Sequence, residues 1–263
     1  MMNPTLLQSA STLLVAALLF LLLICFYLLG YWTRSRGIKK NPHQSKVKLG
    51  TINGTLLGLL GLLLAFTFNM ASSRFDTRRQ VVIEEANSIG TAILRADIYP
   101  DSMRQLLRND FKNYVEERIA FYQAGKDGEE AAEHYHKADV LSKKVWSTVT
   151  TYAKRDNITT RTSEMVPALN AMIDVTTSRR AAGEATVPDS IMYFLFALCC
   201  CSAFLLGYDN KYKIDWIVVT GFAVMLSLTV YTIIDLDRPR SGLINMDAPN
   251  EKIIELRGMF EGD

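Results

Sequence analysis

The sequence predicts an all-α integral membrane protein with four transmembrane helices and a helical soluble insertion between the second and third of them. Three observations lead to this prediction. Apolar residues gather in four long runs, and the stretch between the second and third runs has helical periodicity. No segment alternates apolar and polar residues over a length sufficient for a β-strand. We therefore expect a first transmembrane hairpin (1–71), the insertion (72–189), a second hairpin (190–236) and a C-terminal tail (237–263).

Each apolar run is long enough to cross a bilayer, because a hydrocarbon core of ~30 Å needs about 20 helical residues. The runs are Leu13–Trp32, Ile52–Ala71, Ile191–Tyr208 and Ile214–Ile234. The first run is not a cleaved signal peptide, since residues 1–12 carry no Lys or Arg and the basic residues follow the run instead. The chain is thus predicted to be a multi-pass protein whose surface contacts membrane lipid.

The loops between paired runs predict the orientation. Thr33–Lys48 holds six Lys or Arg and no acidic residue, and the short second loop carries Lys211 and Lys213. Basic residues in short loops stay in the cytoplasm, so the insertion and the tail are expected outside it. Arginines near the membrane ends on the other side argue against this orientation, but long domains are weak topology signals.

Composition gives little support for an enzyme. The net charge of +2 provides no field for nucleic acid, and the four cysteines all fall inside the apolar runs. His134 and His136 are two residues apart, which points them away from each other on a helix. The adjacent Glu84 and Glu85 are interpreted as a solvated helix surface. We expect no catalytic residues, no cofactor, no metal and no nucleic-acid partner.

The insertion is expected to continue directly from the second apolar run. Val82, Ala86, Ile89 and Ile93 form a helical stripe, and Pro100 then breaks the helix. Three more helices are predicted, over residues 102–123, about 129–155 and about 162–180. The last of them contains Pro167, which a helix tolerates in its first turn.

The second run carries two sets of residues that suggest roles. Gly54, Gly58 and Gly61 form a ridge of small residues, whose spacing allows a neighbouring helix to approach closely. Asn53 and Asn69 are amides within or near lipid, and they either line a polar pathway or are hydrated at the membrane surface.

The fourth run ends in a charged group. Asp235 and Asp237 precede Arg238, and an acid one turn inside an apolar helix needs a partner. Arg238, or Arg74 from the second run, could supply it. We interpret Asp235, Asp237 and Arg238 as a structural staple at the membrane surface.

Two blocks carry a family resemblance. "FNMASSRFDTRRQVVIEEANSIGTAILRA" contains an aromatic-Asp-x-x-Arg pattern at Phe75, Asp76 and Arg79 and a Glu-Ala-Asn at 85–87. "DLDRPRSG" follows after the insertion and two further runs, beginning at Asp235. In this order the blocks resemble the bacterial bestrophin-like membrane family of unknown function, over nearly the whole chain. The resemblance implies a bacterial inner-membrane protein.

A more distant similarity links "LLLAFTFNMASSRFDTRR" to the second helix of bestrophins, which are pentameric anion channels. It implies a homo-oligomer around the second run, inorganic ions as cargo and an apolar neck formed by Leu59, Leu62 and Phe66. Arg74 and Arg78 would then form rings at the pore mouth, but anchoring of the helix at the lipid headgroups is the slightly favoured interpretation of these arginines. The resemblance also implies a cytosolic insertion, opposite to the charge pattern. The alternative function is a non-conducting sensor or scaffold whose insertion binds a partner or signal.

Overall fold

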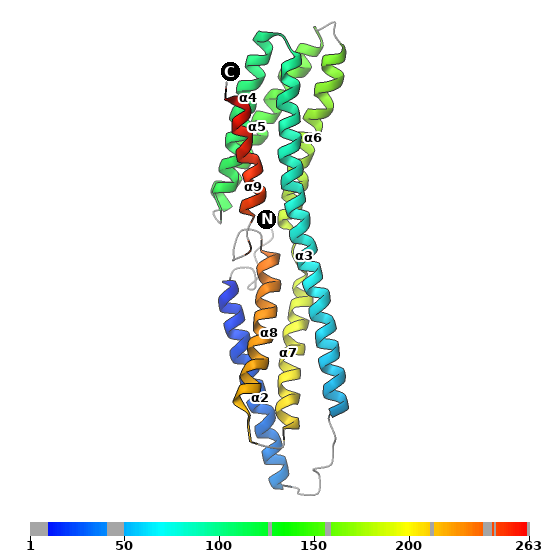
Figure 1. Ribbon diagram of the computed structural model, residues 1–263, viewed down its shortest axis with the longest axis vertical. Helices are drawn as coiled ribbons and strands as arrows, with labels where there is room; N and C mark the ends of the chain where they lie inside the picture. The colour runs from blue at the N-terminus through cyan, green and yellow to red at the C-terminus, as the bar shows by residue number, and fades with distance from the viewer. Residues whose placement is uncertain are drawn as a thin grey trace. The chain divides into compact units, whose positions relative to one another are not determined.

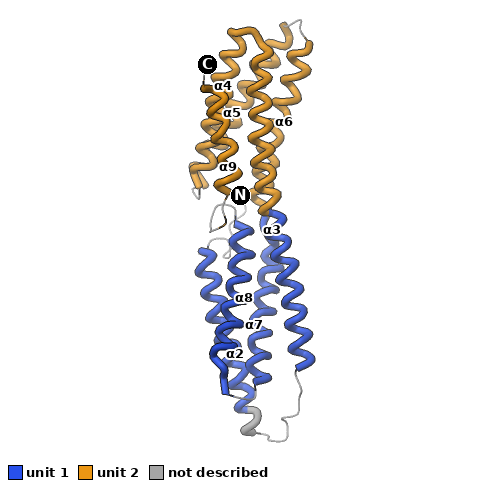
Figure 2. The backbone as a smooth tube through the Cα atoms, in the orientation of Figure 1, with its two compact units in different colours: residues 1–74, 186–238 blue, residues 75–185, 239–263 orange. Residues whose placement is uncertain are grey.

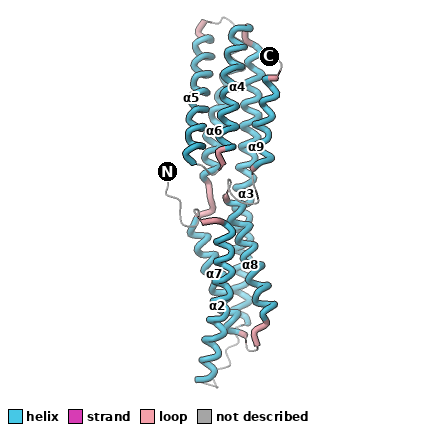
Figure 3. The backbone as a smooth tube through the Cα atoms, turned by 90° about the vertical axis from the view of Figure 1, so that its left-hand side faces the viewer, coloured by secondary structure: helices cyan, strands magenta, loops and turns pink. Residues whose placement is uncertain are grey.

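The computed structural model describes residues 10–40, 50–125, 128–155, 159–210, 213–238, 244 and 246–261. Every regular element within these residues is helical (Figure 3), so the all-α prediction is confirmed for them. The helices are α2 (Thr12–Lys40), α3 (Gly50–Arg95), η2 (Ala96–Ile98), α4 (Asp101–Gln123), α5 (Gly128–Ala153), α6 (Thr159–Glu184), α7 (Asp189–Asp209), α8 (Trp216–Asp237), α9 (Asp247–Ile254) and η3 (Glu255–Phe260). Lys211, Pro239 and the loop beyond residue 40 lie outside the described residues.

The chain divides into two compact units (Figure 2). Unit 1 comprises residues 1–74 and 186–238, and unit 2 comprises residues 75–185 and 239–263. Helix α3 contributes its first half to unit 1 and its second half to unit 2.

Unit 1 contains the apolar helices. Four helical segments are long and apolar enough to cross a membrane, and they include α2, the first half of α3, α7 and α8. The prediction of four such helices is therefore confirmed. Helix α2 runs alongside both α7 and α8 (Figure 1). It also continues to Lys40, eight residues beyond the predicted end of the first run.

Two glycines allow a close approach between α2 and α7 in unit 1. A Cβ atom added to Gly30 of α2 would lie 2.0 Å from the carbonyl oxygen of Phe204 in α7. One added to Gly207 of α7 would lie 2.0 Å from the carbonyl oxygen of Tyr27 in α2. Any side chain at either position would therefore collide with backbone, so the two helices need glycine at both.

Unit 2 is a helical bundle with its own apolar core. The second half of α3, together with α4, α5 and α6, supplies core residues, and α9 and η3 lie along α4 (Figure 1). Fully buried members include Ile89, Ile93, Leu107, Phe111 and Val145. The stripe predicted for α3 thus forms part of this core.

Proline in α6 differs from the sequence-based expectation. Pro167 was expected in the first turn, yet α6 begins at Thr159 and the proline lies well inside the helix. Proline removes one backbone hydrogen bond at such a position. Met165, Ala168 and Leu169 beside it are buried in the unit 2 core, and this packing offsets the loss.

Candidate functional site

The membrane half of α3 has three distinct faces. Successive residues on an α-helix turn by about 100°, so positions three, four and seven apart share a face. On this basis the face carrying Leu59, Leu62 and Phe66 lies roughly 105–130° from two others. One of those carries the glycine ridge, and the other meets the rest of unit 1.

The first face is apolar and exposed. The exposed fractions of Leu59, Leu62 and Phe66 are 46%, 54% and 62%. Large apolar side chains exposed in a row need a partner outside the chain, whether lipid, a second subunit or a narrow pore. The structure thus places all three predicted neck residues together on one open face.

The second face is the glycine ridge. A Cβ atom added to Gly54, Gly58 or Gly61 would meet nothing within 4 Å. Gly30 and Gly207 differ from these ridge glycines, because the space beside each of them is occupied by the backbone of a neighbouring helix in the same chain. The ridge has no such neighbour among the described residues and is free to receive a helix.

The third face packs on unit 1. Leu60, Thr67 and Ala71 are at most 2% exposed. Asn53 is also buried on this face, and its Nδ2 donates to Asp209 Oδ2 of α7 over 3.2 Å. Asn53, predicted either to line a pore or to be hydrated, therefore ties α3 to the end of α7. Asn69 is exposed between the first two faces.

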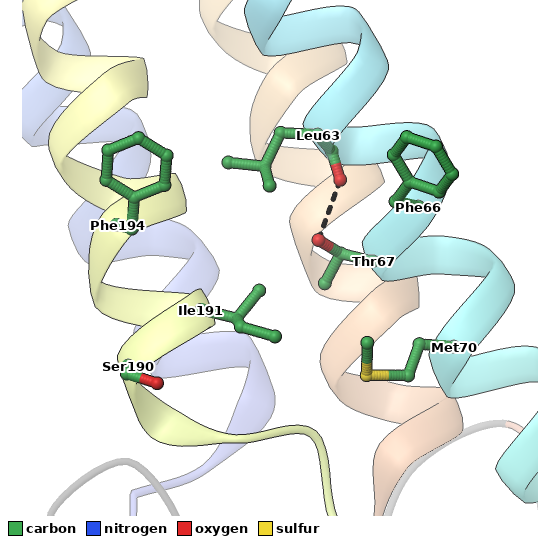
Figure 4. Close-up of a pocket in the computed structure, with 7 residues that line it drawn as sticks. All are labelled: Leu63, Phe66, Thr67, Met70, Ser190, Ile191 and Phe194. Carbon is green, nitrogen blue, oxygen red and sulfur yellow. Dashed lines mark hydrogen bonds between the residues drawn. The ribbon is translucent and has the colours of Figure 1, made fainter.

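A groove of 270 Å³ lies between α3 and α7, on the side of α3 between the first and third faces (Figure 4). Leu63, Phe66, Thr67 and Met70 line it from α3, and Ser190, Ile191 and Phe194 line it from α7, so Phe66 borders both the exposed face and this groove. The Thr67 hydroxyl donates to the carbonyl of Leu63 at 2.7 Å, so this donor is already satisfied within α3. The lining is therefore almost entirely apolar.

The two arginines predicted at a pore mouth have different surroundings. Arg74 is partly buried at the end of the unit 1 half of α3. Arg78 is 4% exposed, and its guanidinium donates to the carbonyls of Ala182 and Ala185 over 3.1 and 2.5 Å. Arg78 thus satisfies carbonyls at the C-terminal end of α6, where a cation is also favoured by the helix dipole. This placement favours a structural role for Arg78, and a mouth role stays a prediction.

The charged end of α8 joins three segments of unit 1. Both oxygens of Asp237 accept the backbone N–H of Val187, at 2.9 and 3.0 Å, just before α7 begins. Arg238 donates to the carbonyl of Ala10 and to the hydroxyl of Thr12, at the start of α2. Asp235 is 1% exposed. The three predicted staple residues therefore lie where the ends of α2, α7 and α8 meet.

The opposite end of unit 1 has a polar cluster that the sequence analysis did not identify. Arg34 of α2 donates to the carbonyl of Tyr208 at 2.7 Å, and its guanidinium lies 5.7 Å from the centre of that ring. Asn210 donates to the hydroxyl of Tyr27 at 2.8 Å. Together with the Asn53–Asp209 bond, these contacts fix the end of α7 to α2 and α3.

A buried ionic cluster occupies unit 2. Glu85 of α3 is fully buried and pairs with Arg118 of α4 at 2.6 Å and with Arg179 of α6. A second nitrogen of Arg179 donates to Asn250 of α9 at 2.7 Å. Helices α3, α4 and α6 therefore meet at one carboxylate, and α9 joins the cluster through Arg179. Glu84 is exposed as predicted, but the solvated-surface interpretation of Glu85 is wrong.

The charge on Arg118 is maintained despite burial. Burial alone would lower the pKa of this guanidinium, but the nearby Glu85 carboxylate and its hydrogen bond outweigh burial and raise the pKa of Arg118. Its ring neighbours are Phe121 and Tyr135, whose centroids lie 4.8 and 5.9 Å away. The arrangement holds a cation in the bundle interior.

Sequence signals for two of these features were present. Glu85 falls three residues after Val82 and four before Ile89, which puts it inside the apolar stripe that the analysis recognised. "LLGY" occurs twice, at 28–31 and 205–208, and its two glycines are Gly30 and Gly207. The partners Arg118 and Arg179 left no comparable signal.

Comparisons with known proteins identify a family and a shared fold. The chain matches the model of the bestrophin-like domain family over residues 21–247. No curated protein matches it significantly. Solved structures with a similar fold include two single-residue variants of a bacterial bestrophin homologue from Klebsiella pneumoniae. One aligns with a TM-score of 0.69 and 12% identity over 95% of this chain and 99% of that chain. The other aligns with a TM-score of 0.67 and 12% identity over 92% of this chain and 99% of that chain.

The apolar helices and the fold together define the class: this is an all-helical membrane protein. The family match spans most of the sequence, and the structural matches share the fold at low identity. The chain belongs to the bestrophin-like family. The family resemblance suggested by the two sequence blocks is therefore confirmed.

Proposed function

We propose that this chain is one subunit of a homo-oligomeric ion channel assembled around α3. The observation that carries the proposal is the three-faced membrane half of that helix. One face packs on its own chain, one offers a ridge of open glycines, and one exposes Leu59, Leu62 and Phe66. A ring of subunits uses all three faces, because the ridge receives a neighbour and the apolar face turns toward the axis.

An apolar constriction accounts for the side chains on the axial face. Leu59, Leu62 and Phe66 follow one another along the helix, so a ring of them would narrow the pathway over two turns. Hydrophobic constrictions gate by excluding water. The bestrophin resemblance suggests that the permeant ions are anions. Asn69 and Arg74 lie beyond the neck, on either side of the axial face, so each is a candidate to contact ions as they enter or leave.

Planar-bilayer recording of the purified protein tests conduction and the neck together. Phe66→Ala is expected to increase current or weaken gating, because it widens the apolar ring. Leu228→Ala is the control: Leu228 is also exposed, at 56%, but belongs to α8 and lies outside the proposed neck and glycine ridge. Equal effects of both changes would contradict the neck, and silence of the wild type across salts and voltages would contradict conduction.

Reversal potentials in a chloride gradient test the ion preference. We expect the reversal potential to shift toward the anion value. Arg74→Glu should reduce that shift if Arg74 lies at the mouth, because it inverts the local charge near passing ions. A shift toward the cation value would contradict anion selectivity.

The glycine ridge carries the prediction of assembly. Native mass spectrometry in mild detergent should show a homo-oligomer, and the bestrophin resemblance suggests five subunits. Gly58→Leu should reduce the oligomer fraction, since its side chain would keep the neighbouring helix away. Gly221→Leu in α8 is the control, because a Cβ there also meets nothing within 4 Å. A monomeric wild type would contradict the ring.

The orientation proposed from the loop charges puts unit 2 outside the cytoplasm. Gly128→Cys, at the exposed start of α5, should then react with an impermeant thiol reagent in intact cells. Lys213→Cys, between α7 and α8, should react only after permeabilisation. The reverse pattern would establish a cytosolic unit 2. Both are tested in a background lacking Cys25 and Cys201, which are exposed.

A non-conducting sensor or scaffold is the second candidate. Unit 2 has an apolar core of its own and a four-helix ionic junction, so it could hold a partner or signal independently of a pore. Such a protein should tolerate Phe66→Ala without loss of function and fail when unit 2 is disrupted.

A further inference from the structure

The ionic cluster of unit 2 has more buried positive than negative charge. Two guanidinium groups, those of Arg118 and Arg179, are paired with the single carboxylate of Glu85. The side chains of Arg118 and Glu85 are 1% and 0% exposed, and that of Arg179 is 11% exposed. Removing a charge from water is costly unless an opposite charge compensates it. Here one positive charge has no carboxylate of its own within the cluster.

Neutral groups compensate part of that charge. Asn250 accepts from Arg179, and the ring of Phe121 lies 4.8 Å from Arg118 and 5.5 Å from Arg179. The ring of Tyr135 lies 5.9 Å from Arg118. Amide oxygens and aromatic faces attract cations, but more weakly than an ion does. Arg118 donates to Glu85 through its Nε–H at 2.6 Å.

An independent observation lies one helical turn away. The side chain of Tyr114 is 1% exposed, and its hydroxyl is buried without a hydrogen-bond partner among the described residues. Tyr114 precedes Arg118 by four residues on α4, so the two side chains share a face. The hydroxyl lies within electrostatic range of Arg118, Glu85 and Arg179 without bonding to any of them. Burial raises the pKa of Tyr114, so this hydroxyl keeps its proton and remains a donor.

We propose that Tyr114, Arg118 and Arg179 form a binding site for a small monovalent inorganic anion inside unit 2. One anion neutralises the uncompensated positive charge and accepts the hydrogen bond that the Tyr114 hydroxyl otherwise lacks. Buried polar groups without partners commonly mark the place of a water or an ion. A neutral water could accept from Tyr114, but it would leave the charge excess unchanged. The charge count therefore favours an anion over a water.

The site lies within one subunit, and the proposal is independent of conduction. It joins α4 and α6 directly, and it reaches α3 through Glu85 and α9 through Asn250. Occupancy should therefore stabilise the whole of unit 2. A ligand that binds only the folded state raises the unfolding temperature in a saturable way.

The test follows thermal unfolding of the full chain in mild detergent, read from Trp146 of α5. Trp32→Phe and Trp216→Phe remove the other two tryptophans, both in unit 1, so fluorescence reports on unit 2. Chloride or nitrate replaces gluconate at constant ionic strength, which keeps screening unchanged. We expect the midpoint to rise saturably with chloride or nitrate, because gluconate is too large for a buried site.

Tyr114→Phe is the decisive variant. In gluconate it should be as stable as the parent or more stable, because it removes a buried group without a partner. With chloride it should lose the midpoint rise or need at least tenfold more anion, so the order of stabilities reverses. Tyr152→Phe in α5 is the matched control and should keep the full anion effect. Arg179→Gln should abolish the effect by removing the excess charge. The proposal is overturned if chloride and gluconate give the same midpoint, or if the parent and Tyr114→Phe respond equally.

Discussion

The two halves of α3 are built for different surroundings. In unit 2 the helix buries Val82, Ala86, Ile89 and Ile93, which are between 0% and 6% exposed. In unit 1 it leaves Phe66 and its neighbours open, and only 17% of its most apolar stretch is buried, against 33% in α2. The apolar face of the second half is covered by other helices of the same chain. The first half exposes what lipid or other subunits must cover, which is why the proposed assembly surface is located there.

The largest expected effect is on the ionic cluster that anchors the second half. Glu85→Gln leaves two buried guanidinium groups without a carboxylate and should destabilise unit 2 by about 3–5 kcal/mol. Glu84→Gln changes the adjacent exposed residue and should have little effect. Denaturant unfolding read from Trp146 measures both. Equal stabilities would mean that the cluster contributes nothing to the difference between the halves.

Shortening one apolar side chain in each half of α3 compares how much the two halves contribute to subunit stability. Ile93→Ala creates a cavity in the unit 2 core and should destabilise the subunit by about 2–5 kcal/mol. Leu62→Ala removes an exposed side chain and should change subunit stability by roughly 0.5 kcal/mol or less. Unfolding in detergent measures both. A large loss for Leu62→Ala would show that this half is already tightly packed by a neighbour.

Glycine substitutions make the same comparison within unit 1. Gly30→Ala places a methyl group against the backbone of α7 and should cost about 1–3 kcal/mol through overpacking. Gly58→Ala adds the same methyl group where the chain leaves open space, so the stability of the isolated subunit should not fall. Thermal unfolding of the monomeric fraction distinguishes the two cases. Identical losses would contradict the open ridge.

Arg78 lies at the start of the unit 2 half of α3, and replacing it distinguishes a structural role at the end of α6 from a role at a pore mouth. Arg78→Gln removes charge-assisted hydrogen bonds to the end of α6 and should destabilise unit 2 by about 1–3 kcal/mol. Reversal potentials should stay unchanged if capping is its main role. A changed ion preference with unchanged stability would instead support the predicted position at a pore mouth.

The smallest expected effect comes from a surface pair on unit 2. The hydrogen bond from Arg257 lowers the pKa of Glu116 below the ordinary glutamate value. A carboxylate with a lowered pKa stabilises the fold above its unfolded-state pKa, ~4.3, and loses that contribution as pH falls through the folded-state value. Both side chains are about half exposed, so the contribution should be roughly 0–1 kcal/mol. Comparing Glu116→Gln with wild type between pH 6 and 3 measures it.

Most of the fold could be predicted because it depends on local patterns. Run length identifies a membrane helix, and the spacing from Val82 to Ile93 extends α3 beyond the membrane run, since no proline interrupts it. The interior position of Pro167 could not be predicted, because packing from other helices compensates for its missing hydrogen bond.

The sites were less predictable because they depend on which helices meet. Asn53 and Asn69 look equivalent in the sequence, yet Asn53 contacts Asp209 and Asn69 is exposed. Arg74 and Arg78 likewise share a helix face, but only the position of α6 reveals that Arg78 binds its carbonyls. Periodicity locates a face of a helix, whereas tertiary contacts decide what covers it.

The paired contact at Gly30 and Gly207 has a consequence for how the protein is made. Its two halves lie near opposite ends of the chain, and translation proceeds at ~5–20 residues per second, so α2 waits roughly 10–35 s before α7 is synthesised. During that interval the surface of α2 around Gly30 is not covered by α7, so another helix with a small residue at the contact can pack there. The order of synthesis thus leaves a period in which α2 of one nascent chain can pair with α7 of another. We expect slower translation to increase such exchanged subunits.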